Sequence, residues 1–208
     1  GTADALVANC GGTLRAWEEA GYQLPTIRRV CHNASAKSRC RPSNENRDPV
    51  IRILGSARSY KGVAALLDSA GQLPLPVEWL GASDSERIEW PSTPSFQFLP
   101  PIPYPEVPDL LARSQILLLP LTDNRFGRTL TSPLKLWDYL ATGVPIVAPA
   151  LPSVLEIQDK TGALLHLYTP GNADEMITAI HSANVAPLRT PSLRTWEQRA
   201  TELEELMQ

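Results

Sequence analysis

The sequence lacks a long hydrophobic run. No apolar segment approaches the ~20 residues that a membrane-spanning helix requires, although 43% of the 208 residues are hydrophobic. The first residues, GTADALVANCGG, also lack the charged and then apolar layout of a signal peptide. We therefore expect a cytoplasmic protein with enough apolar side chains to bury a sizeable core.

The sequence has few residues of the kinds that bind metals. Cys10, Cys31 and Cys40 are odd in number and show no C-x-x-C spacing, and the three histidines are scattered along the chain. Zinc and redox sites need such residues at short, regular spacing. We therefore expect free thiols, no metal and no other cofactor.

An excess of positive charge is absent as well. Lysines and arginines number 19 against 22 aspartates and glutamates, which gives a formal net charge of −3. Such a chain has no global basic field, so nucleic acid is not an expected partner. No G-x-G-x-x-G, P-loop or G-x-S-x-G pattern follows a predicted strand. Nicotinamide-dependent, kinase and hydrolase functions therefore have no residues to carry them.

What the sequence does have is a regular alternation of short strands and helices, with many of its 20 prolines between them. This alternation predicts an α/β fold, a Rossmann-like doubly wound parallel sheet. Strands are expected at 50–55, 76–81, 96–100, 115–121, 146–148 and 163–168, and helices at 63–71, 105–114, 133–142 and 172–184. Loops are expected at 82–94 and 122–131, and a short helical turn at 154–158.

The chain is expected to divide into a main domain and two smaller parts. The N-terminal part has predicted strands at 5–9 and 27–31 and a helix at 13–21, and a polar stretch without apolar periodicity follows at 35–49. We place a boundary near 40–48. The predicted parts are residues 1–40, residues 41–190, and a C-terminal helix in 191–208 that packs back toward the N-terminal part.

The most informative stretch is 131–149, TSPLKLWDYLATGVPIVAP. Ser132 (or Thr131) suits a helix N-cap, Pro133 suits the first helical position, and Gly143 suits the end of the helix. A helix that begins here offers free amides and the positive end of its dipole to an anion. Lys135 in the first turn opposes that dipole unless a negative group lies nearby, which favours a bound phosphate.

The same helix has a predicted buried face. Leu134, Trp137 and Ala141 share that face at helical spacing, and we expect Tyr139 to form the wall of a groove.

Ligands of open parallel sheets bind beyond the carboxyl ends of the strands. Lys61, Arg125 and Arg128 follow predicted strand ends, so we expect them to converge with Lys135 on one phosphate-sized site. Simpler interpretations stay open at this point. Both lysines can be solvated surface residues, the two arginines can serve solubility alone, and Asp138 can pair with a cation on its own helix.

Six segments follow one another in the order found in a known family. They are ILGSARSYKGVAALLDSA, VEWLG, FQFLPPIPYPEVPDLLARSQILLLPL, SPLKLWDYLATGVPIVAPALPSVLEI, GALLHLYTPGNADEMITAI and TWEQRA. In this order they resemble the C-terminal, nucleotide-sugar-binding domain of the group 1 glycosyltransferases, which have the two-domain GT-B fold. The resemblance covers nearly the whole chain. It implies metal-independent transfer of a hexosyl group from a nucleotide-sugar donor to an acceptor, with retention, in polysaccharide or glycoconjugate biosynthesis.

The resemblance also implies a donor site. In this family the lysine of a K-G pair and the first turn of the long helix hold the donor diphosphate, and an acid on that helix holds the ribose. The implied donor-binding residues are Gly55, Arg58, Lys61, Ser132, Pro133, Leu134, Lys135 and Asp138. Lys61 and Lys135 are the implied catalytic residues, because their charges stabilise the departing diphosphate without a metal.

Three residues depart from the family pattern. Ser56 replaces an arginine, Leu130 replaces the first acid of a paired-glutamate motif, and Asp138 is one methylene shorter than the usual glutamate. These changes leave two alternatives: a non-catalytic binding or scaffold domain with a degenerate site, and, more weakly, an epimerase or isomerase of the same architecture. Residues 1–40 resemble the end of an acceptor-binding N-terminal domain. Without the rest of that domain, we expect the chain to bind donor without turnover, and to meet a membrane only through the missing part.

Overall fold

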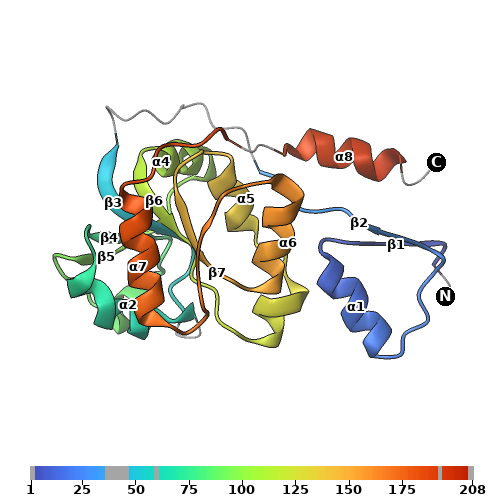
Figure 1. Cartoon of the computed structure of the whole chain (residues 1–208), viewed down its shortest axis with the longest axis horizontal. Helices are drawn as coiled ribbons and strands as arrows, with labels where there is room; N and C mark the ends of the chain where they lie inside the picture. Colours follow the sequence, from blue (N-terminus) through green and yellow to red (C-terminus); the bar gives the residue numbers. More distant parts are fainter. Residues whose placement is uncertain (1–2, 36–46, 59–60, 192–193, 206–208) are drawn as a thin grey trace.

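The computed structural model of the protein describes residues 3–35, 47–58, 61–191 and 194–205. Most of the predicted linker at 35–49, including Cys40, lies outside these residues, as does most of the predicted boundary at 40–48. Figure 1 shows a larger α/β unit built from β3 to α7, and a smaller unit of β1, α1 and β2 that has α8 beside it.

The larger unit is built on a sheet of six parallel strands in the order β5-β4-β3-β6-β7-β8. The strands are β3 (Asp48–Leu54), β4 (Val77–Leu80), β5 (Phe96–Leu99), β6 (Ser114–Leu118), β7 (Ile146–Pro149) and β8 (His166–Tyr168). This order confirms the predicted doubly wound sheet. The chain runs outward from β3 to β5 and then from β6 to β8, so the direction reverses between β3 and β6, where ligands of such sheets bind.

Helices cover both faces of this sheet (Figure 1). One face packs against α2 (Val63–Ser69), η2 (Ala70–Gln72) and α7 (Ala173–Asn184), and the other against α4 (Val107–Ala112), α5 (Leu134–Leu140) and α6 (Pro152–Thr161). In β6, Ile116 and Leu118 belong to the first core and Leu117 to the second. Successive strand side chains point to opposite faces, so this strand is apolar on both, as a central parallel strand must be.

Three segments predicted to be loops or turns contain helices. The segment 82–94 holds α3 (Asp84–Glu89), where Ser83 and Glu86 form a reciprocal capping box; that signal was readable in the sequence. The segment 122–131 holds a π-helix, η4 (Phe126–Leu130). The turn predicted at 154–158 is the ten-residue helix α6. A further 3-10 turn, η3 (Tyr104–Glu106), precedes α4.

The smaller unit is a two-stranded parallel sheet of β1 (Ala5–Ala8) and β2 (Ile27–Val30), joined by α1 (Gly11–Glu19). Helix α1 begins two residues earlier than predicted, with Cys10 at the N-cap. Helix α8 (Trp196–Glu205) lies beside this unit, because the Cys31 thiol donates to the Arg199 carbonyl at 4.0 Å and the Ser35 amide donates to the Arg194 carbonyl at 2.9 Å.

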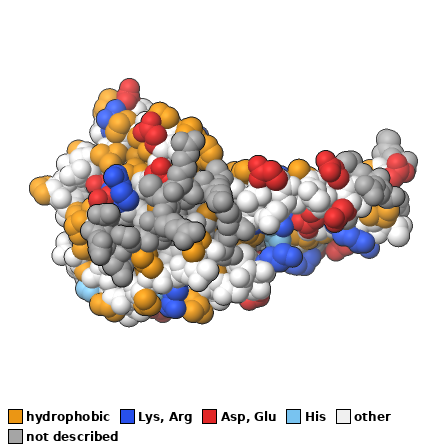
Figure 2. Space-filling view, turned by 90° about the horizontal axis from the view of Figure 1, so that it is seen from above, with side chains coloured by type: hydrophobic (Ala, Val, Ile, Leu, Met, Phe, Trp, Pro, Cys, Tyr) orange, Lys and Arg blue, Asp and Glu red, His pale blue; other side chains and the backbone are white. Residues whose placement is uncertain are grey.

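Seen from above, α8 and the smaller unit project from the larger one, and acidic and basic side chains gather on the projection (Figure 2). Among the described residues, no helix is both long enough and apolar enough to cross a bilayer. Cys10 and Cys31 are buried free thiols.

Candidate functional site

Two lysines from distant parts of the chain meet at the carboxyl end of β3. Lys61 precedes α2, and Lys135 lies in the first turn of α5. Lys61 is near enough for its charge and a side-chain hydrogen-bond contact to affect the titration of Lys135. The structure therefore brings together the two residues predicted to hold a diphosphate, at the point where the sheet order reverses.

Gly55 makes room for this arrangement. Its φ of +105° lies in the left-handed region that side chains disfavour. A Cβ at Gly55 would lie 2.2 Å from the Lys135 Nζ, so the ammonium rests directly over the backbone of the turn after β3. The Gly55 carbonyl accepts a hydrogen bond from the Trp79 indole at 2.6 Å, and the Gly55 amide donates to the Leu80 carbonyl at 2.6 Å. These bonds hold the turn in place.

Ser56 orients Lys61. The Lys61 Nζ donates to the Ser56 carbonyl at 2.8 Å and to the Ser56 hydroxyl at 2.6 Å. Ser56 stands where the family that the sequence resembles has an arginine. It thus orients the Lys61 amine and supplies no positive charge itself.

The surroundings of Lys135 disfavour its protonated, charged form. Burial, followed by the charge of Lys61 and a hydrogen-bond contact with it, lowers the pKa of Lys135 from 10.5 to about 7. Desolvation and a like charge both disfavour the protonated amine. An anion placed between the two amines would offset both effects, so the local field favours a negatively charged ligand.

Asp138 lies one turn after Lys135 on α5. Burial raises the pKa of its carboxyl group to about 6, and a hydrogen bond with the Tyr104 side chain opposes this rise. Sequence reasoning missed Tyr104, which follows a proline-rich turn in η3 and is 53% exposed. The carboxylate predicted to hold a ribose is therefore already oriented by a phenol.

The predicted cap of α5 is wrong in detail. The helix starts at Leu134, and Pro133 occupies the N-cap position without a side-chain cap. The Ser132 hydroxyl accepts a hydrogen bond from the Trp137 indole at 3.2 Å, and the Ser132 carbonyl accepts one from the Asn33 side chain at 2.8 Å. The buried indole N–H needs an acceptor, which takes the hydroxyl away from the helix amides. Leu134, expected on the buried face, is 51% exposed.

Tyr139 was expected in a groove wall and is instead fully buried. Its hydroxyl accepts from the Leu54 amide at 2.8 Å and donates to the Leu118 carbonyl at 3.3 Å. The paired register of β3 and β6 ends at Arg52 and Leu117. Tyr139 therefore bridges the two strands just beyond their ladder, at the carboxyl ends that flank the lysine pair.

The predicted convergence of the arginines with the lysines is wrong. Arg125 and Arg128 line a separate cavity with α1, and Arg128 forms an ion pair with Asp123 at 2.7 Å. The direction of η4 causes this, because the π-helix turns these side chains toward the smaller unit. Arg58 is exposed, and its carbonyl accepts the Lys61 amide at 2.9 Å.

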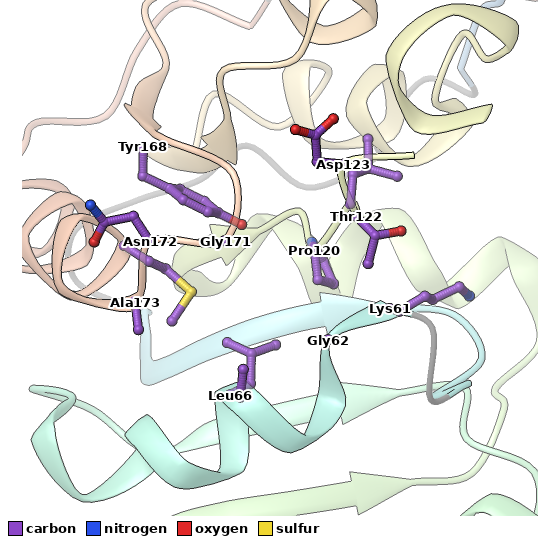
Figure 3. A pocket seen from close by; sticks show the side chains of 13 residues that line it. Lys61, Gly62, Leu66, Pro120, Thr122, Asp123, Tyr168, Gly171, Asn172 and Ala173 are labelled. Atoms are coloured by element: carbon purple, nitrogen blue, oxygen red, sulfur yellow. The ribbon is translucent and has the colours of Figure 1, made fainter. Parts of the chain in front are cut away.

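A cavity of about 170 Å³ lies beside Lys61, between α2, α7 and the end of β6 (Figure 3). Its lining includes the Lys61 stem, Leu66, Pro120, Tyr168 and Met176. Figure 3 shows the Asp123 side chain directed away from Lys61. The cavity is thus largely apolar, and Lys61 lies at its edge. In the described part of the chain, no cluster of three or more His, Cys, Asp or Glu side chains is arranged to hold a metal.

Solved structures share this fold. A sucrose-phosphate synthase from Thermosynechococcus elongatus superposes with a TM-score of 0.78 at 17% identity, over 99% of this chain and 58% of the other. AviGT4, a glycosyltransferase involved in avilamycin A biosynthesis, gives 0.59 at 16% identity, over 97% and 62%. A UDP-forming trehalose-phosphate synthase from Burkholderia xenovorans gives 0.55 at 12% identity, over 98% and 57%.

The chain thus spans 57 to 62% of the length of these three structures. At such identities the similarity establishes the fold, which is the Rossmann-like half of a GT-B architecture. A search of curated protein sequences finds no significant match.

The family itself is shown by sequence. The model of the family described as glycosyl transferases group 1 matches residues 48–183, which is more than half of the chain and contains both lysines, Asp138 and the whole six-stranded sheet. The chain belongs to the group 1 glycosyl transferases.

Proposed function

We propose that this chain is the donor-binding half of a sugar-transferring enzyme and that it binds a nucleoside diphosphate sugar at the carboxyl ends of β3 and β6. The diphosphate contacts Lys61 and Lys135, with the turn at Gly55 beneath it and the start of α5 beside it. Asp138, oriented by Tyr104, accepts hydrogen bonds from the ribose hydroxyls. Arg58 is exposed beside this loop and reaches the diphosphate only if its side chain turns inward.

The observation that carries this proposal is the lysine pair. Two amines held close together, one of them with a pKa lowered to about 7, cost stability in the empty protein. Such an arrangement is typical of functional sites, where perturbed pKa values are concentrated. The same charges stabilise a departing nucleoside diphosphate, which supports transfer without a metal.

The donor base is proposed to be uracil. Support comes from the trehalose-phosphate synthase of the same fold, which is described as UDP-forming. We further infer that the acceptor is bound mainly by chain beyond this sequence, since the three solved structures are longer than this chain. On this inference the chain alone binds donor with little turnover. We also propose, from the family resemblance of the sequence, that the enzyme transfers a hexosyl group with retention of its anomeric configuration.

Isothermal titration calorimetry with UDP, GDP and ADP tests the proposal. We expect binding of UDP in preference to the others, and a loss of about 10- to 100-fold on Lys61→Ala, because a charged hydrogen bond contributes about 1.5–3 kcal/mol. Lys160→Ala, near the C-terminal end of α6, is the matched control and leaves affinity unchanged. Absence of binding of all three nucleotides at millimolar concentration would refute the proposal.

A further inference from the structure

The cavity beside Lys61 has mostly apolar walls. Helix α2 contributes Ala65 and Leu66, the segment after β6 contributes Pro120, and α7 contributes Met176. Its volume of about 170 Å³ is close to that of apolar cavities that hold one benzene molecule, which measure ~150 Å³. A methionine thioether also makes favourable contacts with aromatic rings. The walls therefore match a single aromatic ring.

One polar group without a partner points into this cavity. Tyr168, the last residue of β8, is only 8% exposed, and Figure 3 shows its hydroxyl directed toward Pro120. Within the described part of the chain, the Tyr168 hydroxyl takes part in no hydrogen bond. Burial raises the pKa of Tyr168, so the hydroxyl keeps its proton and can donate it to a hydrogen bond. The cavity thus presents one free donor.

The other polar side chains that line the cavity are already bonded within the protein. They are Lys61, Thr122, Asp123 and Asn172, bonded to Ser56, Asn124, Arg128 and Glu175 respectively. A buried water needs about two to four polar partners, whereas these side chains leave it only the Tyr168 hydroxyl. A mostly apolar ligand with one acceptor atom fits this lining better than water does.

We propose that the cavity between α2 and α7 is a second ligand site, which binds one aromatic ring that carries a hydrogen-bond acceptor. The ring packs between Leu66 and Met176, and its acceptor atom accepts a hydrogen bond from the Tyr168 hydroxyl. The Lys61 stem forms part of the wall, while its ammonium is bonded to Ser56 and directed away from the cavity (Figure 3). This site is distinct from the proposed nucleotide site and does not depend on the donor function.

Pyridine and benzene are a matched pair of probes, because the two rings have nearly the same shape and only pyridine carries an acceptor. Each is titrated into the whole chain while the NMR signal of the Met176 methyl group is followed, since a contacting aromatic ring shifts that signal. Met176→Leu identifies the signal. We expect saturable shifts with both probes at millimolar concentration.

Removal of the donor separates the two probes. Tyr168→Phe should weaken pyridine binding about 3- to 10-fold, because one hydrogen bond is lost, and should leave benzene binding within about twofold. The melting temperature of this variant should not fall, because the hydroxyl that it lacks has no partner. Tyr22→Phe, at an exposed tyrosine outside the cavity, is the control and should change neither affinity.

A second pair of variants blocks the cavity. Ala64 and Ala65 are both exposed on α2, but only Ala65 lines the cavity. Ala65→Phe should fill the cavity with its own ring and abolish the binding of both probes. Ala64→Phe, which adds the same ring beside the cavity, should leave both affinities unchanged.

Three results of these titrations would overturn the inference: no saturable shift with pyridine, pyridine binding that is insensitive to Tyr168→Phe, or pyridine binding that survives Ala65→Phe. The pyridine titration is then repeated with UDP present, and the affinity should stay within about twofold. Displacement of pyridine by UDP would make the cavity part of the nucleotide site and also overturn the inference. Failure of UDP to bind counts against the donor proposal alone and leaves the ring site standing.

Discussion

The molecule gathers positive charge in two regions, and they differ in their surroundings. Lys61 and Lys135 lie against the backbone at the end of β3, and Lys135 has a pKa lowered to about 7. Arg125 and Arg128 are exposed on η4, and Arg128 is paired with Asp123. The contrast teaches that the number of cations alone does not decide how strongly a region favours an anion. Burial of the cations makes their electrostatic attraction to an anion stronger, because charges removed from water interact more strongly.

The largest effect that distinguishes the two regions is expected from Lys135→Ala. UDP affinity should fall about 10- to 100-fold, since a charge-assisted contact is lost. The melting temperature at pH 7 should nevertheless rise, because the folded state no longer holds a buried amine with a lowered pKa. This gain should fade as pH rises from 7 toward 10.5, where the folded and unfolded states of the wild type both lose the charge. Calorimetry and thermal denaturation measure the two effects; a variant less stable at pH 7 would contradict the account.

The second test alters the backbone beneath the amine. Gly55→Ala should lower the free energy of unfolding by about 1–3 kcal/mol, because its φ of +105° is unfavourable for alanine. It should also weaken UDP binding, because the new methyl group displaces the Lys135 ammonium. Gly162→Ala is the control: it has a positive φ of +67° but no neighbour within 4 Å of the new Cβ. Equal losses of UDP affinity in both variants would rule out a specific role for Gly55.

A third test concerns the strand junction. Tyr139→Phe leaves the buried Leu54 amide without its acceptor, which should cost about 1–3 kcal/mol of unfolding free energy in urea denaturation. Hydrogen exchange at the Leu54 amide should accelerate. Tyr22→Phe, at an exposed tyrosine of the smaller unit, serves as the control and should alter stability by less than about 0.5 kcal/mol. Unchanged exchange at Leu54 would show that the hydroxyl bridge is dispensable.

The sequence was sufficient to predict the larger unit and the meeting of the lysines. Strand and helix periodicities locate every strand of the sheet, and the K-G pair and α5 both follow strands that end on the same edge. The side-chain partners were not predictable by local pattern. Ser132 has the composition of an N-cap, but Trp137 lies within reach only after the helix has packed, and its indole takes the hydroxyl.

The arginines show the same limit at longer range. Nothing between 122 and 131 signals a π-helix, so the direction of Arg125 and Arg128 depends on how η4 packs against α1, more than 100 residues earlier in the chain. No sequence pattern around Tyr139 shows whether its side chain lines a groove or bridges two strands. Tertiary contacts decide such cases, whereas periodicity decides only which faces are apolar.

A fourth prediction follows from the lowered pKa of Lys135. An anion between the amines raises that pKa, so UDP binding at pH 8 should take up roughly 0.9 proton, the fraction that a group with a pKa of about 7 has lost at that pH. Affinity should be highest below about pH 7 and fall between pH 7 and 9. Calorimetry in buffers with different ionisation enthalpies measures the uptake. Lys135→Ala should abolish it, and uptake that persists in this variant would assign it to another group.

The smallest effect on UDP affinity is expected from Arg125, which was predicted to converge with the lysines but lines a separate cavity. Arg125→Ala should change the UDP affinity by less than about twofold, because its exposed charge acts on the lysine site only through solvent and salt, which screen charges beyond about 10 Å. The comparison with Lys61→Ala at 50 and 300 mM salt sharpens the contrast. The lysine effect should persist at the higher salt, and any arginine effect should vanish. A loss on Arg125→Ala as large as that on Lys61→Ala would mean that η4 turns inward when a donor is bound, and that the two cationic regions act as one site.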